Sequence, residues 1–140
     1  MFIKQLSIFV ENKFGRLESI IDAIGKKGVN IRALSIADTT DFGILRIIVD
    51  NTDKAKSALD EIGVIAKATD VIAVYIDDKT GGLASILKLI TDKGISVEYM
   101  YAFLSRNEGK ALMVLKADDE PETAKVLTSN GVKLLDPKEL

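Results

Sequence analysis

The sequence repeats once, and this repeat restricts the chain to folds built from two similar halves. Residues 13–31 align with residues 79–97 at a constant shift of 66, and eight of the 19 aligned pairs are identical. A long period that occurs only twice indicates a duplicated domain and not a solenoid. The identical pairs are Lys13/Lys79, Gly15/Gly81, Leu17/Leu83, Ser19/Ser85, Ile20/Ile86, Ile24/Ile90, Lys27/Lys93 and Gly28/Gly94.

The same alignment predicts the domain limits. From Asp50 onward the shift is 68, which places a two-residue insertion near "SRNEGK" in the second copy. Loop tips tolerate such insertions. The stretch "AKATDVIAV", where one copy gives way to the next, contains neither proline nor glycine. We therefore predict two domains without a flexible linker, residues 1–68 and residues 69–140.

The spacing of apolar residues changes in the same order within each copy. Alternation at every second residue predicts a strand, and a stripe at i, i+3, i+4 and i+7 then predicts a helix ending at Gly28 or Gly94. Two strands, a helix and a short strand follow, so the order is βαββαβ twice. This order predicts an α+β fold of two ferredoxin-like units side by side, each an antiparallel sheet with both helices on one face. The later stretches are "NIRALSIAD", "FGILRIIVD", "TDKAKSALDEI" and "VIAKA", then "SVEYMYAFLS", "KALMVLKAD", "EPETAKVLTSN" and "VKLL".

Composition argues against several classes of function. The chain has no cysteine and no histidine, so it lacks thiolate ligands and the commonest general base at neutral pH. We expect no catalytic residues, no metal site and no cofactor. Its 19 basic and 21 acidic residues are interspersed and give a net charge of -2, which offers no basic surface for nucleic acid. The strand "DFGILRIIV" lacks the alternate aromatic residues of RNA-recognition motifs.

The distribution of apolar residues predicts a cytoplasmic protein that does not contact membranes. The start, "MFIKQLSIFV", carries polar residues at strand spacing and no small-residue cleavage site follows it. No apolar run approaches the roughly 20 residues that span a bilayer. We therefore expect a cytoplasmic location.

The stretches "VENKFGRLESI" and "KKGVNIRALSI" resemble the ACT domain, a regulatory module that binds amino acids and related effectors. The family pattern Asn-x-x-Gly-x-Leu is matched by Asn12, Gly15 and Leu17, and the pattern Gly-Val-Asn-Ile by residues 28–31. The second copy keeps the glycines and leucine but has Asp78 and Ser96 at the two asparagine positions. Both copies lack the frequent proline before the glycine and have Phe14 and Thr80 there. The resemblance covers essentially the whole chain, as a pair of such domains with no catalytic domain attached.

The resemblance implies that a free amino acid or similar small effector binds beside these turns. It places the ligand-binding residues at Asn12, Lys13, Phe14, Gly15, Arg16, Leu17, Asn30 and Ile31 in the first copy, and at Asp78, Thr80, Gly81, Gly82, Leu83, Ser96 and Val97 in the second. It also implies pockets near the junction of the copies and a metabolic enzyme or regulator as the receiver of the signal.

Elementary chemistry supports this use of the turn. A glycine loop that leads into a helix leaves the first helical N–H groups unpaired beside the positive end of the helix dipole, where a carboxylate fits. Asn12 and Asn30 both donate and accept hydrogen bonds, and together they would hold the carboxylate and ammonium groups of an amino acid. The alternative is that the glycines only form the turn and Asn12 only caps the helix.

The sheet face opposite the helices is predicted to be apolar, which favours a homodimer formed through it. The sequence of the edge strands is compatible with two registers, which place different residues on this face. A ligand-independent adaptor or regulatory subunit is the alternative to an effector-binding protein. The residues expected on this face are Phe9, Ile44, Ile48, Tyr75, Leu112 and Val114, with either Ala33, Ser35, Tyr99 and Tyr101 or Leu34, Ile36, Met100 and Ala102 on the edges.

Overall fold

The computed structural model describes residues 1–38, 41–105 and 109–140. Its packing divides the chain into two compact units. The first unit comprises residues 4–69, and the second comprises residues 70–140 together with residues 1–3. The domain limits 1–68 and 69–140 stay a prediction.

Both units have the predicted order of elements. The first contains β1 (Ile3–Glu11), α1 (Arg16–Lys26), β2 (Ile31–Asp38), β3 (Phe42–Val49), α2 (Thr52–Glu61) and the start of β4 (Ala66–Asp77). The second continues from β4 with α3 (Gly82–Thr91), β5 (Val97–Ala102), β6 (Lys110–Ala117), α4 (Glu120–Ser129) and the 3-10 turn η1 (Pro137–Glu139).

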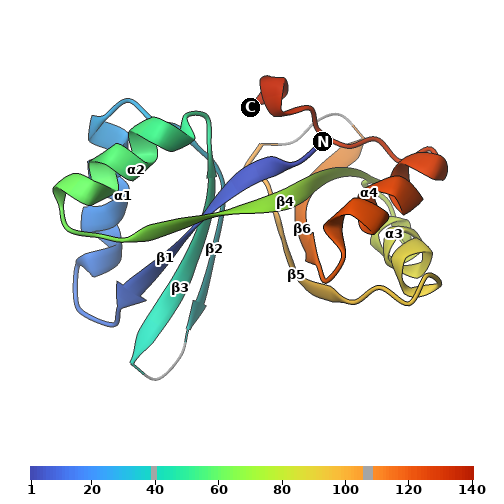
Figure 1. Cartoon of the computed structure of the whole chain (residues 1–140), viewed down its shortest axis with the longest axis horizontal. Coiled ribbons are helices and arrows are strands. Elements are labelled where there is room, and N and C mark those ends of the chain that lie inside the picture. The colour runs from blue at the N-terminus through green and yellow to red at the C-terminus, as the bar shows by residue number, and fades with distance from the viewer. Residues whose placement is uncertain (39–40, 106–108) are drawn as a thin grey trace. The chain divides into compact units, whose positions relative to one another are not determined.

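The sheets are antiparallel, as predicted. The strand order is β2-β3-β1 in the first unit and β5-β6-β4 in the second. Within each unit both helices lie on one face of the sheet, α1 and α2 in the first and α3 and α4 in the second (Figure 1). The ferredoxin-like prediction is confirmed for each unit taken by itself.

The final strands differ from the prediction. The last three residues of "VIAKA" and the first strand of the second copy form one strand, β4, which is continuous from Ala66 to Asp77. The segment "VKLL" forms no regular strand. It contacts β4 through an isolated bridge between Val74 and Leu134 and a 2.8 Å hydrogen bond from the Leu135 N–H to the Ala73 carbonyl. Pro137, which has no N–H to donate, soon follows.

Each unit has a core between its sheet and its helices. In the first, alternate residues of β1 and β3 pack against α1 and α2, and each fully buried aliphatic side chain contributes about 1.5–3 kcal/mol. The second core repeats this arrangement with β4, β6, α3 and α4. The first core contains Leu6, Ile8, Val10, Ile20, Ile24, Leu45, Ile47, Val49 and Leu59, and the second contains Ile72, Val74, Ile76, Ile86, Ile90, Leu115 and Leu127.

The opposite sheet face is only partly open, which corrects the sequence prediction. Phe9 is 67% exposed, but Ile48, Leu112 and Val114 are buried. The register of the edge strands is also decided. Leu34 and Met100 pack against the helix-side cores, so the register that put Leu34, Ile36, Met100 and Ala102 on the opposite face is excluded.

None of the helices in the described part of the chain has both the length and the apolar composition of a membrane-spanning segment.

Candidate ligand-binding site

The turn after the first strand of each copy has the same backbone geometry. Gly15 and Gly81 are left-handed, with φ of 76° and 84°, and each precedes a helix. Glycine adopts this conformation without the strain that a Cβ causes. The Ser19 N–H bonds the Gly15 carbonyl at 3.0 Å, and the Ser85 N–H bonds the Gly81 carbonyl at the same distance. The repeated motif therefore encodes one strand-to-helix turn, used twice.

The side chain of Asn12 does not cap α1. The capping position is Gly15, and no side chain accepts a hydrogen bond there. The Asn12 backbone N–H donates to the Asp41 carbonyl at 3.2 Å. Within the part of the chain that the structure describes, no hydrogen bond engages the N–H groups of Leu17 and Glu18. The first turn of α1 therefore presents backbone donors to an anion.

A cavity of about 330 Å³ lies beside the first turn. The ends of two strands form it, because β1 and β2 run in the same direction and both pair with β3. Apolar side chains from β1, α1 and β2 line one part, and polar side chains line the rest. The lining residues are Val10, Glu11, Asn12, Lys13, Leu17, Ile36, Asp38 and Gly43.

The cavity lining contains one ion pair, Lys13 with Glu11, and a further carboxylate, Asp38. Lys13 Nζ contacts Glu11 Oε2 at 2.7 Å, and this hydrogen bond lowers the pKa of the Glu11 carboxyl below its ordinary value. Asp38 enters from β2, opposite the turn. The cavity thus combines an amide, an ammonium group and two carboxylates with an apolar wall, a combination that suits a small zwitterion.

The structure brings together only some of the residues predicted for the first copy. Asn12, Lys13 and Leu17 line the cavity. Phe14 is fully exposed, and Arg16 lines a different cavity. Gly15 shapes the turn but does not line either one.

Asn30 and Ile31 lie at the other end of the sheet from Asn12, so Asn12 and Asn30 of one copy do not meet, and their joint role in binding stays a prediction. The crossover through α1 makes β2 parallel to β1, which puts the start of β2 about 25 Å from its end. The Asn30 N–H donates to Asp50 Oδ1 at 3.0 Å, and the Ser96 N–H donates to Asp118 Oδ1 at 3.2 Å. In both copies, the residue just before the second strand therefore donates its backbone N–H to an aspartate side chain.

In the second copy, one of the predicted residues lines a cavity. Gly82 borders a cavity of about 540 Å³. The lining does not include Asp78, Thr80, Gly81 or Leu83, nor Ser96 and Val97 at the start of β5.

In the cavity of the first unit, sequence reasoning missed Val10, Glu11, Ile36, Asp38 and Gly43. A signal for them existed, because the carboxyl ends of parallel strands lie at the same edge of a sheet. The polar ends "VEN" and "IAD" of the first two strands therefore belong together. Among the described residues, no group of three Asp or Glu side chains is placed to hold a metal ion.

Residues 1–140 match the ACT domain pair family over their whole length. The chain belongs to this family. The resemblance in the turn motifs is thereby confirmed for both copies, and the two βαββαβ units are a pair of ACT domains.

Two solved structures are similar to this ACT domain pair. Protein BT0572 from Bacteroides thetaiotaomicron is 38% identical, with a TM-score of 0.90 over 96% of this chain and 92% of that one. The ligand-free regulatory subunit of aspartate kinase from Thermus thermophilus shares the fold, with 14% identity and a TM-score of 0.67 over 90% of each chain.

A third relative is the acetolactate synthase small subunit of Buchnera aphidicola. It is 33% identical over 70 residues, which cover 49% of this chain and 43% of that protein. The match thus spans less than half of that relative.

Proposed function

We propose that this ACT domain pair is a regulatory protein that binds a free amino acid, or a similar small effector, in the cavity of the first unit. The observation that carries the proposal is the cavity itself, which places Asn12 and Asp38 beside the first turn of α1. Its volume of about 330 Å³ lies at the small end of the usual range for ligand pockets, about 300–1,000 Å³.

The polar groups suit the two ends of an amino acid. The ligand carboxylate binds the N–H groups at the start of α1 and the amide of Asn12. The ligand ammonium binds the Asp38 carboxylate. The ligand side chain contacts the apolar wall formed by Val10, Leu17 and Ile36.

The wider role follows from the family. Similar proteins include a regulatory subunit of aspartate kinase, which shares the fold, and an acetolactate synthase small subunit. We infer that this chain acts on a metabolic enzyme or regulator in the cytoplasm rather than carrying out catalysis. The competing function is a structural adaptor that works without an effector.

A thermal-shift screen of the twenty amino acids separates these functions. A ligand at 100 times its Kd stabilises the protein by about 2.7 kcal/mol, whereas an adaptor gains nothing. If none of the amino acids raises Tm, the binding proposal fails for this ligand class and the adaptor is favoured.

The first prediction concerns Asn12→Asp. The new carboxylate faces the ligand carboxylate, and we expect binding to weaken by about 1–3 kcal/mol. Asp78→Asn in the second copy is the matched control, because Asp78 lies outside both cavities and its replacement should leave the affinity unchanged. Calorimetry with the amino acid found in the screen measures both. A loss of binding in the control alone would place the site in the second unit.

A further inference from the structure

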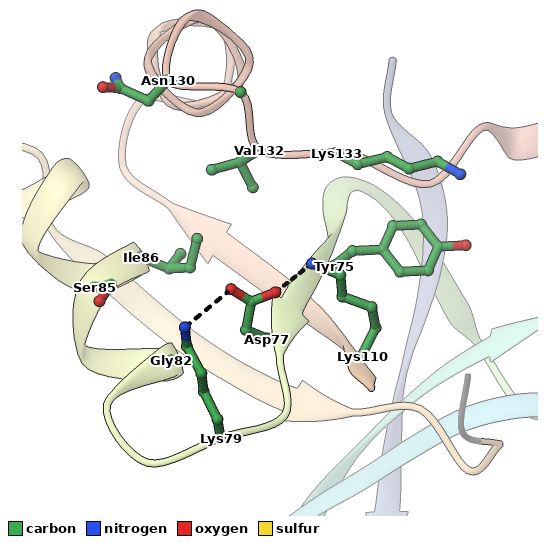
Figure 2. A pocket seen from close by; sticks show the side chains of 11 residues that line it. Tyr75, Asp77, Lys79, Gly82, Ser85, Ile86, Lys110, Asn130, Val132 and Lys133 are labelled. Carbon is green, nitrogen blue, oxygen red and sulfur yellow. Dashed lines mark hydrogen bonds and ion pairs between the residues drawn. The ribbon is translucent and has the colours of Figure 1, made fainter. Parts of the chain in front are cut away.

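The cavity of about 540 Å³ in the second unit is not explained by an amino-acid site in the first. It lies between the end of β4, the start of α3 and the segment after α4 (Figure 2). Side chains from all three line it, together with one residue at the start of β6. They are Tyr75, Asp77, Lys79, Gly82, Ser85, Ile86, Lys110, Asn130, Gly131, Val132 and Lys133.

The first unit has a cavity of about 520 Å³ at the equivalent position. The internal repeat relates the two, because residues before the insertion correspond at a shift of 66 and residues after it at a shift of 68. This cavity thus has a counterpart in each copy, and the two can be compared residue by residue. The corresponding pairs are Phe9/Tyr75, Glu11/Asp77, Arg16/Gly82, Phe42/Lys110, Gly63/Gly131, Val64/Val132 and Ile65/Lys133.

The two cavities have diverged in chemistry. In the first, the Phe9 and Phe42 rings pack edge to face with centroids 5.7 Å apart, and Ile65 is 84% exposed beside them. In the second, lysines replace Phe42 and Ile65. The second cavity also loses the long side chain of Arg16, because glycine stands at that position. The lining at this place in the fold is mostly apolar in the first copy and carries three lysines in the second.

Three lysines line the second cavity. Lys110 forms an ion pair with Asp77 Oδ1, and Lys79 Nζ lies 3.8 Å from Asp77 Oδ2. Figure 2 shows the Asp77 carboxylate between these two lysines. Lys133 Nζ lies 5.0 Å from the centre of the Tyr75 ring. The lysines come from three different segments, so the cluster is a product of the fold.

Two acidic side chains oppose this positive charge. The hydrogen bond from Lys110 lowers the pKa of Asp77, so this carboxylate is ionised at neutral pH. Glu139 accepts a 3.2 Å hydrogen bond from the Tyr75 hydroxyl and lies outside the cavity lining. The lining therefore carries three positive charges against one negative charge, and Asp77 occupies the place that a second anion would take.

We propose that this cavity binds a small organic polyanion, which carries two or more phosphate or carboxylate groups. Its anionic groups bind Lys79, Lys110 and Lys133, and compete with Asp77 for the first two. Ammonium groups bind both phosphate and carboxylate as point charges, so the chemistry that the two classes share is their multiple negative charge. The cavity is larger than an inorganic ion needs, which leaves room for an organic body beside Tyr75 and Ile86.

This site is independent of the proposed amino-acid site. The two cavities lie in different units and have no lining residue in common. An effector in one and a polyanion in the other would let the protein respond to two metabolite classes. Failure of the amino-acid screen would therefore leave the polyanion site untouched, and the reverse also holds.

Titration of the full chain with pyrophosphate and with citrate, followed by calorimetry and amide NMR, tests the proposal. We expect binding of at least one probe, with shifts at residues 75–86 and 130–133 and an affinity that falls with ionic strength. Binding of pyrophosphate alone assigns the site to phosphate compounds, and binding of citrate alone assigns it to polycarboxylates. No binding of either probe at millimolar concentration overturns the proposal.

Variants test the named residues. Lys110→Phe with Lys133→Ile restores the residues of the first copy and should weaken binding at least tenfold, and Lys110→Gln alone should show a smaller loss. Asp77→Asn removes the internal competitor and should tighten binding several-fold, an effect that a purely structural role does not produce. Lys125→Gln, on the exposed side of α4, is the control and should bind as the unmodified protein does. Equal losses in the control and in Lys110→Gln would contradict the site.

Discussion

At the residue scale, Gly82 is the glycine where a side chain has least room. An added Cβ would overlap the backbone carbonyl oxygen of Asp77, although Arg16 stands at the same position of the first copy. The turns of the two copies thus share a left-handed glycine but differ at the next residue. There the backbone of the second copy folds back more closely on the strand that precedes it.

The second prediction follows from this contact. Gly82→Ala forces the backbone of the turn to shift, and we expect it to destabilise the protein by about 1–3 kcal/mol. Gly25→Ala is the control, because Gly25 lies within α1 and an added Cβ meets nothing there. Replacing a helical glycine by alanine should stabilise by about 0.5–1 kcal/mol. Urea unfolding measures both, and a neutral Gly82→Ala would show that the turn has more space than the contact implies.

Glu120 carries a largely buried carboxyl group. Its Oε2 atom is buried and has no hydrogen-bond partner among the described residues, while Lys116 Nζ lies 3.6 Å from Oε1. Burial raises the pKa of Glu120 above its ordinary value of 4.5, and the neighbouring Lys116 lowers it only in part. Glu98 is the other charged group that acts on this carboxyl, and it adds to the rise.

The third prediction is a pH dependence from this residue. Because the folded pKa is raised, the contribution of Glu120 to stability is fully present below pH 4.5 and is lost as the pH rises through the folded value. Glu120→Gln removes this loss. We expect the variant to gain stability relative to the unmodified protein between pH 4 and pH 7, as measured by urea unfolding at about three pH values. A constant difference across this range would show that Glu120 titrates as it does in the unfolded chain.

At the element scale, the four helices start in two different ways. The helices α1 and α3 start at left-handed glycines without a side-chain cap. The helices α2 and α4 are capped, because Asn51 Oδ1 accepts the Lys54 N–H at 3.0 Å and Asp119 Oδ1 accepts the Glu122 N–H at 3.1 Å. Each copy thus has one capped helix and one helix with an open start, and the open start of each copy borders a cavity.

The fourth prediction separates capping from ligand binding. Asn51→Ala should cost about 0.5–2 kcal/mol of stability, and Asp119→Ala should cost a similar amount, since each leaves a helical N–H without its acceptor. Asn12→Ala should change stability little, because Asn12 caps no helix, yet it should weaken effector binding. Unfolding and calorimetry on the same variants distinguish the roles. A destabilisation by Asn12→Ala as large as that by Asn51→Ala would return Asn12 to a structural role.

At the scale of the whole molecule, apolar side chains of the first unit stay exposed. Phe9, Phe42 and Ile65 gather around one cavity, and they are 67%, 43% and 84% exposed. The second unit has polar residues at the same positions. The apolar surface for a second copy is therefore smaller than the open sheet faces predicted from the sequence, and it is concentrated on one unit.

The fifth prediction is a homodimer that covers this surface. Burial of apolar area stabilises association by about 25 cal/mol per Å² before the entropic cost of binding. Phe9→Ser with Phe42→Lys should produce monomers, while Leu104→Ser, a change at another exposed apolar residue, should not. Sedimentation at tens of micromolar measures the assembly. A monomeric unmodified protein at that concentration would contradict the prediction.

The duplicated fold could be predicted from local patterns in the sequence. The shift of 66 and the alternating and helical apolar spacings depend on local backbone geometry, which repeats wherever the same residues repeat. The glycine turns that lead into α1 and α3 followed from the same local signals, as did the starts of α2 and α4. None of these features required knowledge of which residues meet across the fold.

The groups that surround each turn could not be predicted in this way, because they come from distant parts of the chain. The direction of β2 separated Asn12 from Asn30 and brought Asp38 to Asn12, because a crossover helix returns the chain to the start of the sheet. The lysines at 79, 110 and 133 have no common spacing in the sequence, and only the pairing of β6 with β4 and the position of the segment after α4 bring them to one cavity. Contacts between segments far apart in the chain depend on the packing of the whole unit, and local sequence patterns do not record it.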